Sequence, residues 1–457
     1  MKREINHQAM DCYLSFQCVP PPMTIFRDIH QLPPAHMLIY TPQKLEVREY
    51  WDVHLSDHPH HSESQYIQNL EELIHESVKM RLISDVPLGA FLSGGIDSSV
   101  IVYNMTKAMS DPALTFSIGF TEERFSELKY ARMISSRLKT RHSELIVEPK
   151  AIEVLPKLVW HFDEPFADSS AIPTYYVSKI TREHVTVALS GDGGDELFAG
   201  YQRRYYLNVL EDKFRRVIPD PVRHTLIAFL AQIYPKADWL PRFLRFKYSL
   251  SNISMELERA YFHDRSTFRP ELKDKLYHPD LKEVLGDFTP YLIFDHYFSR
   301  ARSNDLLSRI LYVDLKTYLP NDLLVKVDRM SMANSLEVRS PFLDHKFIEF
   351  AMTIPSYLKL NGKTSKYILR RYLQGKVPQE IIDRGKMGFS IPLSLWLKND
   401  LRDMVEDVLF SRNARERGYF RYEYIRKMWN HHLKGMRDFS VQLWTLLMLE
   451  LWHQMFV

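Results

Sequence analysis

The chain has 457 residues and a formal net charge of +3; hydrophobic residues make up 45% of it and charged residues 26%. These values predict a globular protein of about two or three domains, and the small charge gives no argument for binding to nucleic acid or to an anionic membrane surface. The two cysteines, Cys12 and Cys18, exclude a disulfide framework and favour a reducing, cytoplasmic environment. The sequence has no basic and apolar leader and no run of about 20 apolar residues, so we expect neither secretion nor a membrane span.

The first part of the chain, residues 1–55, contains two clusters of prolines, at 20–22 and 33–34, between short apolar pieces. About fifty residues rarely bury enough surface to fold alone. We therefore expect this segment to have no core of its own.

From residue 62 onward, helical and strand patterns alternate. Apolar residues at helical spacing predict a helix over 65–82. Predicted strands follow at Val86–Leu92, Leu114–Phe120, Glu144–Val147 and Val185–Leu189. Predicted helices lie between them at Ser98–Met109, Phe125–Leu138 and Ala171–Thr181. This alternation favours an α/β fold with a doubly wound parallel sheet, in which ligands bind at the carboxyl ends of the strands.

The loop after the first of these strands reads SGGIDSS, residues 93–99. Gly94 and Gly95 allow successive backbone N–H groups to turn toward one point, and the following helix adds a partial positive charge. Hydroxyl donors come from Ser93, Ser98 and Ser99. This combination predicts a site for phosphate or pyrophosphate, and Asp97 beside an anion suggests a bridging Mg²⁺.

A second loop, SGDGGDE at residues 190–196, follows the last predicted strand. It contains three glycines and three carboxylates, so it is either a solvated acidic turn or a second part of the same site. Because both loops follow parallel strands, we expect them to open at one edge of the sheet. Asp195 would then join Asp97 around Mg²⁺.

Several carboxylates precede this loop, in the segment DEPFADSS at residues 163–170. Asp168 is expected to cap the following helix. Asp163 and Glu164 could instead hold the α-ammonium of an amino-acid substrate.

The remainder of the chain is expected to be largely helical, with an insertion of unknown purpose at about residues 202–304. Near its end, Arg384 to Phe389 forms a short loop with two cations and two glycines. This loop is either an exposed basic turn or a segment that closes over an anion, with Lys386 facing the anion.

Four motifs now point to a known family. SGGIDSS resembles the pyrophosphate loop of the ATP-pyrophosphatase superfamily. Together with LSGDGGDELFAGY, SLEVRSPFLDHKFIEFA and DRGKMGFSIP, in this order, it resembles the synthetase half of glutamine-hydrolysing asparagine synthetases. The resemblance implies an adenine-nucleotide α-hydrolase-like fold over residues 62–400, with C-terminal helices over 401–457. Residues 1–55 resemble the last part of a class II glutaminase domain, most of which is missing from the chain.

The resemblance also implies roles for individual residues. The expected ATP and pyrophosphate contacts are Leu92, Ser93, Gly94, Gly95, Asp97, Ser98, Ser99, Ile118, Ser190 and Gly191. The expected ligands of Mg²⁺ are Asp97 and Asp195. The expected catalytic residues are Lys386, which would neutralise charge on the α-phosphate and pyrophosphate, and Asp192. The expected substrate contacts are Asp163, Glu164, Ser169, Ser170 and Glu196.

The reaction implied is the amidation of aspartate. Its carboxylate would attack the α-phosphorus of ATP to give an acyl-adenylate and pyrophosphate, and ammonia would then displace AMP. Three alternatives stay open: another carboxylate acceptor such as a sugar acid, peptide or cell-surface precursor; a sulfur-inserting or tRNA-modifying enzyme; and a non-catalytic fragment of a split gene.

The nitrogen source is a separate question. Glutaminases of this family use a cysteine at the mature N-terminus, whose α-amine is the base, and neither Cys12 nor Cys18 can take that role. We therefore expect this chain not to hydrolyse glutamine itself. Three sources of ammonia stay open: free ammonia, a separate glutaminase, or an upstream fragment that this chain lacks. The resemblance suggests a homodimer.

Overall fold

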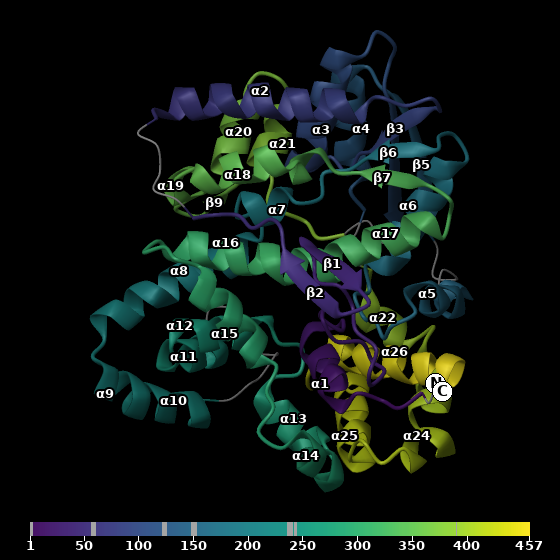
Figure 1. Ribbon diagram of the computed structural model, residues 1–457, viewed down its shortest axis with the longest axis vertical. Helices are drawn as coiled ribbons and strands as arrows, with labels where there is room; N and C mark the ends of the chain where they lie inside the picture. Colours follow the sequence, from purple (N-terminus) through teal and green to yellow (C-terminus); the bar gives the residue numbers. More distant parts are fainter. Residues whose placement is uncertain are drawn as a thin grey trace.

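A five-stranded parallel sheet lies in one half of the molecule (Figure 1). The computed structural model describes residues 3–55, 61–120, 126–147, 153–234, 241, 245–389 and 391–457. In spatial order the strands are β5 (Arg141–Val147), β4 (Leu114–Phe120), β3 (Leu88–Phe91), β6 (Val187–Leu189) and β7 (Glu337–Arg339). The predicted doubly wound parallel sheet is confirmed, with each of the four predicted strands shifted by a few residues at most. The three-residue strand β7 was not predicted, because so short a run carries no periodicity.

Helices cover both faces of this sheet. On one face lie α3 (Ile96–Ala108) and α4 (Leu128–Leu138), with α2 (Glu63–Arg81) packed on α3. On the other lie α6 (Ala171–Arg182) and α17 (Leu324–Met332), which pack against each other. The helix predicted from Phe125 begins at Leu128, and Phe125 itself lies outside the described residues.

The other half of the molecule is mainly helical over the described part of residues 202–304 (Figure 1). The elements here are α8 (Gln202–Val217), α9 (Asp220–Val222), the π-helix η3 (Arg223–Ile227), α10 (Ala228–Ile233), α11 (Lys247–Ser254), α12 (Leu257–Arg265), α13 (Pro270–Leu276), α14 (Pro279–Leu285) and α15 (Tyr291–Arg300). After α16 (Leu306–Lys316) and η5 (Leu319–Leu323), the chain returns to the sheet through α17.

The last third of the chain consists mainly of short helices around these two halves. They are η6 (Pro341–Leu343), α18 (His345–Thr353), α19 (Ser356–Lys359), α20 (Tyr367–Leu373), α21 (Gln379–Asp383), α22 (Leu393–Lys398), α23 (Arg402–Leu409), α24 (Arg412–Glu416), α25 (Tyr422–Leu433) and α26 (Ser440–Phe456). A short hairpin, β8 (Leu360–Asn361) and β9 (Thr364–Ser365), joins α19 to α20. In the described parts of the chain we find no helix long and apolar enough to cross a bilayer.

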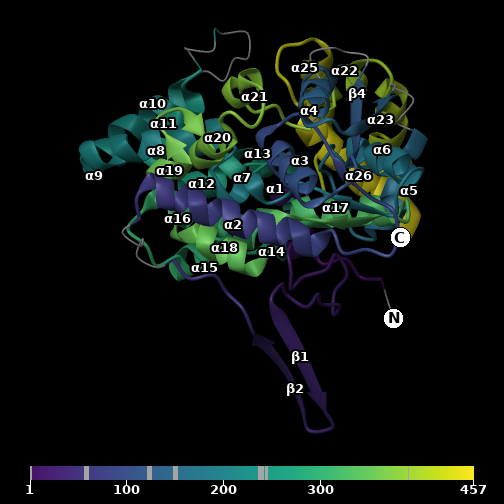
Figure 2. The same cartoon turned by 90° about the horizontal axis from the view of Figure 1, so that it is seen from above.

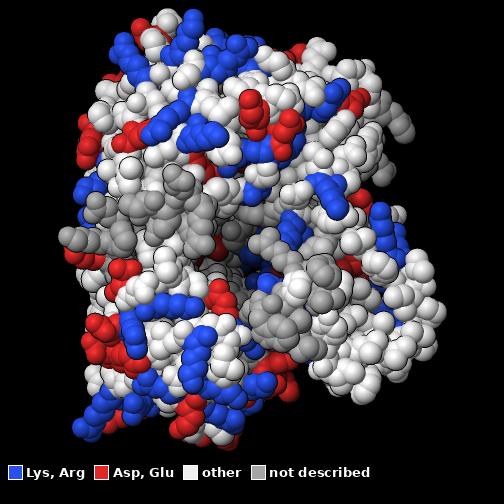
Figure 3. Space-filling model, turned by 180° about the vertical axis from the view of Figure 1, so that it is seen from behind, with Lys and Arg blue, Asp and Glu red and all other residues white. Residues whose placement is uncertain are grey.

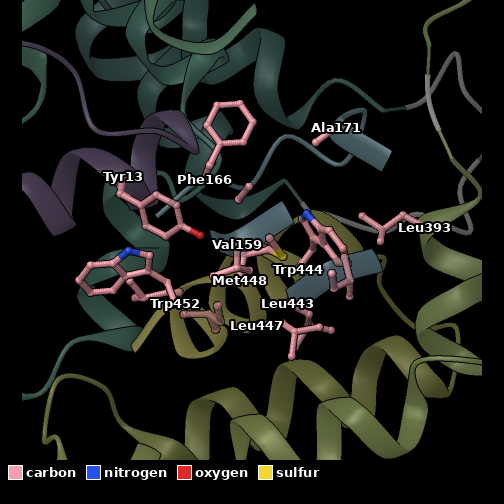
Figure 4. Close-up of a cluster of buried hydrophobic side chains, with 14 of the residues drawn as sticks. Tyr13, Val159, Phe166, Ala171, Leu393, Leu443, Trp444, Leu447, Met448 and Trp452 are labelled. Carbon is pink, nitrogen blue, oxygen red and sulfur yellow. The ribbon is translucent and has the colours of Figure 1, made fainter. Parts of the chain in front are cut away.

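The N-terminal segment is divided between the core and the surface. Helix α1 (His7–Phe16) is buried, and Tyr13 packs in one apolar cluster with Trp444 and Trp452 of α26 and with α5 (Leu155–Phe162) (Figure 4). The Tyr13 hydroxyl donates to the carbonyl of Thr445 at 2.7 Å. Residues 1–55 thus have no core of their own, as expected, because α1 shares the core of the C-terminal helices.

The hairpin of β1 (His36–Thr41) and β2 (Lys44–Glu49) instead protrudes from the body (Figure 2). Its register places four exposed apolar side chains on one face: Leu38, Tyr40, Leu45 and Val47.

Candidate active site

Two loops meet at the carboxyl edge of the sheet. Strands β3 and β6 are neighbours, with Ala90 paired to Leu189, so the loops that follow them start side by side. The first loop leads into α3 and carries Asp97; the second leads into α7 (Gly194–Leu197) and carries Asp195. The predicted convergence of the two loops is what the structure shows.

Glycines make this close approach feasible. A Cβ at Gly191 would lie 2.8 Å from the Cβ of Asp97, and a Cβ at Gly194 would lie 2.5 Å from its Oδ1. Real Cβ atoms do not approach other atoms so closely. Any larger residue at Gly191 or Gly194 would therefore push the two loops apart.

Four charged side chains meet between the loops. Lys366 forms ion pairs with Asp97 and, at 2.5 Å, with Oδ1 of Asp195. Lys386 pairs with Oδ2 of Asp195. Burial alone would raise the pKa of Asp195, but the two lysines outweigh it and hold that pKa well below its ordinary value. Burial keeps the pKa of Asp97 above its ordinary value despite Lys366.

These residues fit the magnesium site that the sequence predicts. Oδ1 of Asp97 is buried and accepts no hydrogen bond from any described residue, so it has a lone pair to offer. In the part of the chain that the structure describes, no group of three or more His, Cys, Asp or Glu side chains is arranged to hold a metal. Two carboxylates suffice for Mg²⁺ when a nucleotide brings its own phosphate oxygens. Asp97 and Asp195 would hold such an ion, which would neutralise charge on the phosphates.

A cleft of about 380 Å³ opens beside this cluster. The face in Figure 3 is hollowed near its middle, where acidic and basic side chains come together. Most of the predicted site residues line the cleft: Leu92, Ser93, Asp97, Ser98, Ile118, Ser169, Ser170, Ser190, Gly191, Asp192, Asp195, Glu196 and Lys386. A smaller adjoining pocket reaches Gly95 and is also lined by Lys386.

Two residues of the first loop support it from behind rather than facing the cleft. The Ser99 hydroxyl is buried and donates to the carbonyl of Gly95 at 2.7 Å. Gly94 has a φ of +70°, and its carbonyl accepts a hydrogen bond from Arg384. Direct contact of Ser99 and Gly94 with the nucleotide stays a prediction.

Asp163 and Glu164 also lie outside the cleft, so the structure does not bring these two predicted substrate contacts to the site. Asp163 is exposed and pairs with Arg329 at 3.1 Å. Glu164 accepts the backbone N–H of Ile25 at 2.8 Å and so ties the N-terminal segment to the end of α5. In the structure the two carboxylates contact neighbouring parts of the fold instead.

The structural role of Glu164 predicts a pH dependence. Burial raises its pKa from 4.5 to about 7 in the folded protein. The unfolded chain therefore loses this proton at lower pH, and stability falls as pH rises between these two values. We expect Glu164→Gln to remove this contribution. The free energy of unfolding, measured with urea, should then decrease from about pH 5 to about pH 8 by about 2 kcal/mol less in the variant than in the wild type. An unchanged pH dependence, or a changed KM for the acceptor, would contradict this assignment.

Asp168 does lie in the cleft wall, but its partners differ from a simple helix cap. It accepts the backbone N–H of Ser170 at 2.9 Å and pairs with Lys326 of α17 at 2.7 Å. Burial acts to raise the pKa of Asp168, but Lys326 outweighs it and keeps that pKa below its ordinary value. This buried pair joins α6 to α17 beneath the site.

Lys366 is the main site residue that the sequence reasoning missed. It follows the β8–β9 hairpin with a φ of +53°, and its backbone N–H donates to the carbonyl of Phe198. The only signal was its place in the run GKTSK, which resembles part of an unrelated phosphate loop. Arg384 was noted only as a cation; it pairs with Glu127 at 2.5 Å and anchors the start of the Lys386 loop.

The chain is similar in sequence to known proteins. A family model described as asparagine synthase matches residues 69–454. Asparagine synthetase (glutamine-hydrolyzing) 1 of Bacillus subtilis is 34% identical over 98% of this chain and 69% of its own length. Asparagine synthetase (glutamine-hydrolyzing) 3 of the same organism is 27% identical over 85% of this chain and 60% of its own. The amidase chyE of Penicillium rubens is 25% identical over 87% and 63%.

Proposed function

Because the chain belongs to the asparagine synthase family, whose members use ATP to make amides, we propose that it converts aspartate to asparagine through an acyl-adenylate. The observation that supports this most strongly is the meeting of two glycine-bearing loops, with Asp97, Asp195 and Lys386, at one edge of the sheet. Such a site supplies positioning and charge stabilisation, and the reaction needs no protein nucleophile.

In the first step a carboxylate oxygen of the acceptor attacks the α-phosphorus of ATP, and the bond to the β-phosphate oxygen breaks. Ser93 and Ser98 donate hydrogen bonds to the phosphates from the cleft wall. Leu92 and Ile118 lie at the ends of β3 and β4 and flank the adenosine. Lys386 neutralises the charge that grows on the α-phosphate and on the leaving pyrophosphate.

In the second step ammonia attacks the acyl carbon, and AMP leaves with the oxygen that the carboxylate contributed. Asp192 lies in the cleft, where its carboxylate accepts a hydrogen bond from Ser190 at 2.7 Å. We propose that Asp192 contacts the attacking ammonia.

An amino-acid acceptor is favoured by Glu196. Its Oε1 accepts the hydroxyl of Tyr201 at 2.6 Å, while its buried Oε2 has no hydrogen-bond partner among the described residues. A buried carboxylate oxygen without a donor is an unfavourable arrangement that the α-ammonium of aspartate would relieve. With Asp163 and Glu164 outside the cleft and Asp168 paired to Lys326, Glu196 is the carboxylate best placed for this contact.

The nitrogen donor proposed is ammonia, supplied free or by a separate glutaminase. The exposed apolar face of the β1–β2 hairpin, formed by Leu38, Tyr40, Leu45 and Val47, offers a surface for such a partner.

The proposal is tested by incubating the protein with ATP, Mg²⁺, aspartate and either ammonium or glutamine, and measuring AMP, pyrophosphate and asparagine. We expect AMP and asparagine with ammonium, and neither with glutamine alone. Formation of ADP and phosphate would contradict the proposed chemistry. AMP formed with a different carboxylate, but not with aspartate, would keep the ligase chemistry and overturn the acceptor.

A further inference from the structure

One surface helix of the 202–304 region turns an apolar stripe toward solvent. Elements α9, η3 and α10 form consecutive helical turns over residues 220–233. Five apolar side chains on these turns are exposed: Val222, Leu226, Phe229, Leu230 and Ile233. Their spacing of three and four residues places them on one side of the helix, while Arg223 and Ala231 are buried on the other. We call the stripe of these five residues the apolar ridge.

The ridge lies at the periphery of the molecule (Figures 1 and 2). In the space-filling view, the corresponding lower right part of the surface is almost entirely free of charged side chains (Figure 3). The neighbouring helices add Phe214, Val217 and Phe246, which are also exposed. Monomeric proteins rarely leave apolar surface of this kind gathered in one place unless something binds there.

The same region has a net positive charge larger than that of the whole chain. Residues 202–254 contain ten Lys and Arg and four Asp and Glu, a net charge of +6, whereas the whole chain has +3. Lys213 and Arg216 of α8 are exposed, as is Arg245 just before α11. Helix α11 packs against both α8 and α10, so these cations lie on or next to the helices that adjoin the ridge, and Arg216 pairs with Asp212 at 2.8 Å.

We propose that the apolar ridge docks on an anionic membrane surface. An amphipathic helix with an apolar stripe and flanking Lys and Arg is suited to lie in the plane of the lipid headgroups. At about 1.5 Å per residue, 14 residues are too short to span a bilayer, so the contact is peripheral. A second copy of this chain is disfavoured, because it would bring a second region of charge +6 against the first.

This docking also has a consequence for the cleft. Tyr201 lines the cleft, and α8 begins at the next residue and leads toward the ridge. The membrane would therefore hold the cleft in a fixed orientation relative to the bilayer surface.

Flotation with lipid vesicles tests the proposal. We expect the protein to float with vesicles of phosphatidylcholine and phosphatidylglycerol and to float less at high salt. With vesicles of phosphatidylcholine alone we expect it to remain in the bottom fraction. The double substitution Leu226→Glu and Phe229→Glu is expected to reduce the bound fraction about tenfold or more. The matched control is Leu292→Glu on α15, where the side chain is 54% exposed, against 53% and 57% for Leu226 and Phe229; it is expected to bind as the wild type does.

Thermal unfolding and gel filtration accompany these measurements. If the thermal midpoint of the double variant is lowered, the flotation experiment is repeated with the single variant Ile233→Glu, whose side chain is 61% exposed in the wild type. Wild-type protein that floats with neither vesicle would overturn the proposal, and so would a folded variant that floats like the wild type. A wild-type dimer that the substitutions convert to a monomer would show that the ridge is an interface between copies instead.

Discussion

Replacing Lys386 with alanine is expected to lower the rate of ATP conversion to AMP by about 10²-fold or more. Lys386 is the cation of the loop between Gly385 and Gly388, and it faces both the cleft and Asp195. Burial would lower its pKa, but Asp195 and Asp97 outweigh this and raise it, so the side chain stays charged as the phosphates arrive. Alanine removes the positive charge that would neutralise the negative charge developing on the pyrophosphate.

The same substitution should leave the fold intact. The Lys386 side chain is 30% exposed, and Asp195 also pairs with Lys366 at 2.5 Å, so the Asp195 carboxylate keeps a cationic partner when Lys386 is replaced. Release of pyrophosphate and the thermal midpoint are measured together, with Lys79→Ala on the exposed side of α2 as the control. Pyrophosphate release at the wild-type rate in Lys386→Ala would remove this residue from the mechanism.

Replacing Gly200 with alanine is expected to reduce turnover about as strongly, for a steric reason. A Cβ at this position would lie 1.8 Å from Oδ1 of Asp195 and 2.2 Å from Cε of Lys366. Both side chains would have to move, so the ion pairs that hold Asp195 in place would break. Overpacking of this kind costs about 1–3 kcal/mol of stability, but the loss of turnover should exceed what that destabilisation explains.

Gly362 provides the matched control for this variant. It lies in the β8–β9 turn with a φ of +57°, and a Cβ added there would have no atom of the described residues within 4 Å beyond its own chain neighbours. Gly362→Ala therefore strains the backbone by about 1 kcal/mol without touching the charged cluster. Equal turnover losses in Gly200→Ala and Gly362→Ala would show that general destabilisation, and not the displaced Asp195, is responsible.

The sequence was most informative where chemistry and local pattern coincide. The SGGIDSS and SGDGGDE loops each follow a buried strand, so their meeting at one edge followed from the geometry of parallel sheets. Lys386 could be predicted from its local pattern, a cation between two glycines. The resemblance to a known family supplied the roles that residue types alone could not.

The missed residues depend on tertiary contacts. Lys366 reaches Asp97 and Asp195 from a hairpin far away in the sequence, and nothing in its neighbours indicates that. Glu164 was predicted to contact the substrate as a carboxylate, whereas its partner in the structure, Ile25, belongs to the N-terminal segment. The basic character of the region around the apolar ridge does not show in the net charge of the whole chain, because the remainder of the chain is acidic.

The central claim, that a carboxylate is activated by adenylation in this cleft, is tested most directly with aspartate whose carboxylates carry heavy oxygen. The protein is incubated with this aspartate, ATP, Mg²⁺ and ammonium, and the AMP is analysed by mass spectrometry. We predict one heavy oxygen in each AMP formed, because the acceptor oxygen stays on the phosphorus when ammonia displaces it. AMP without the label, or ADP in its place, would contradict the account.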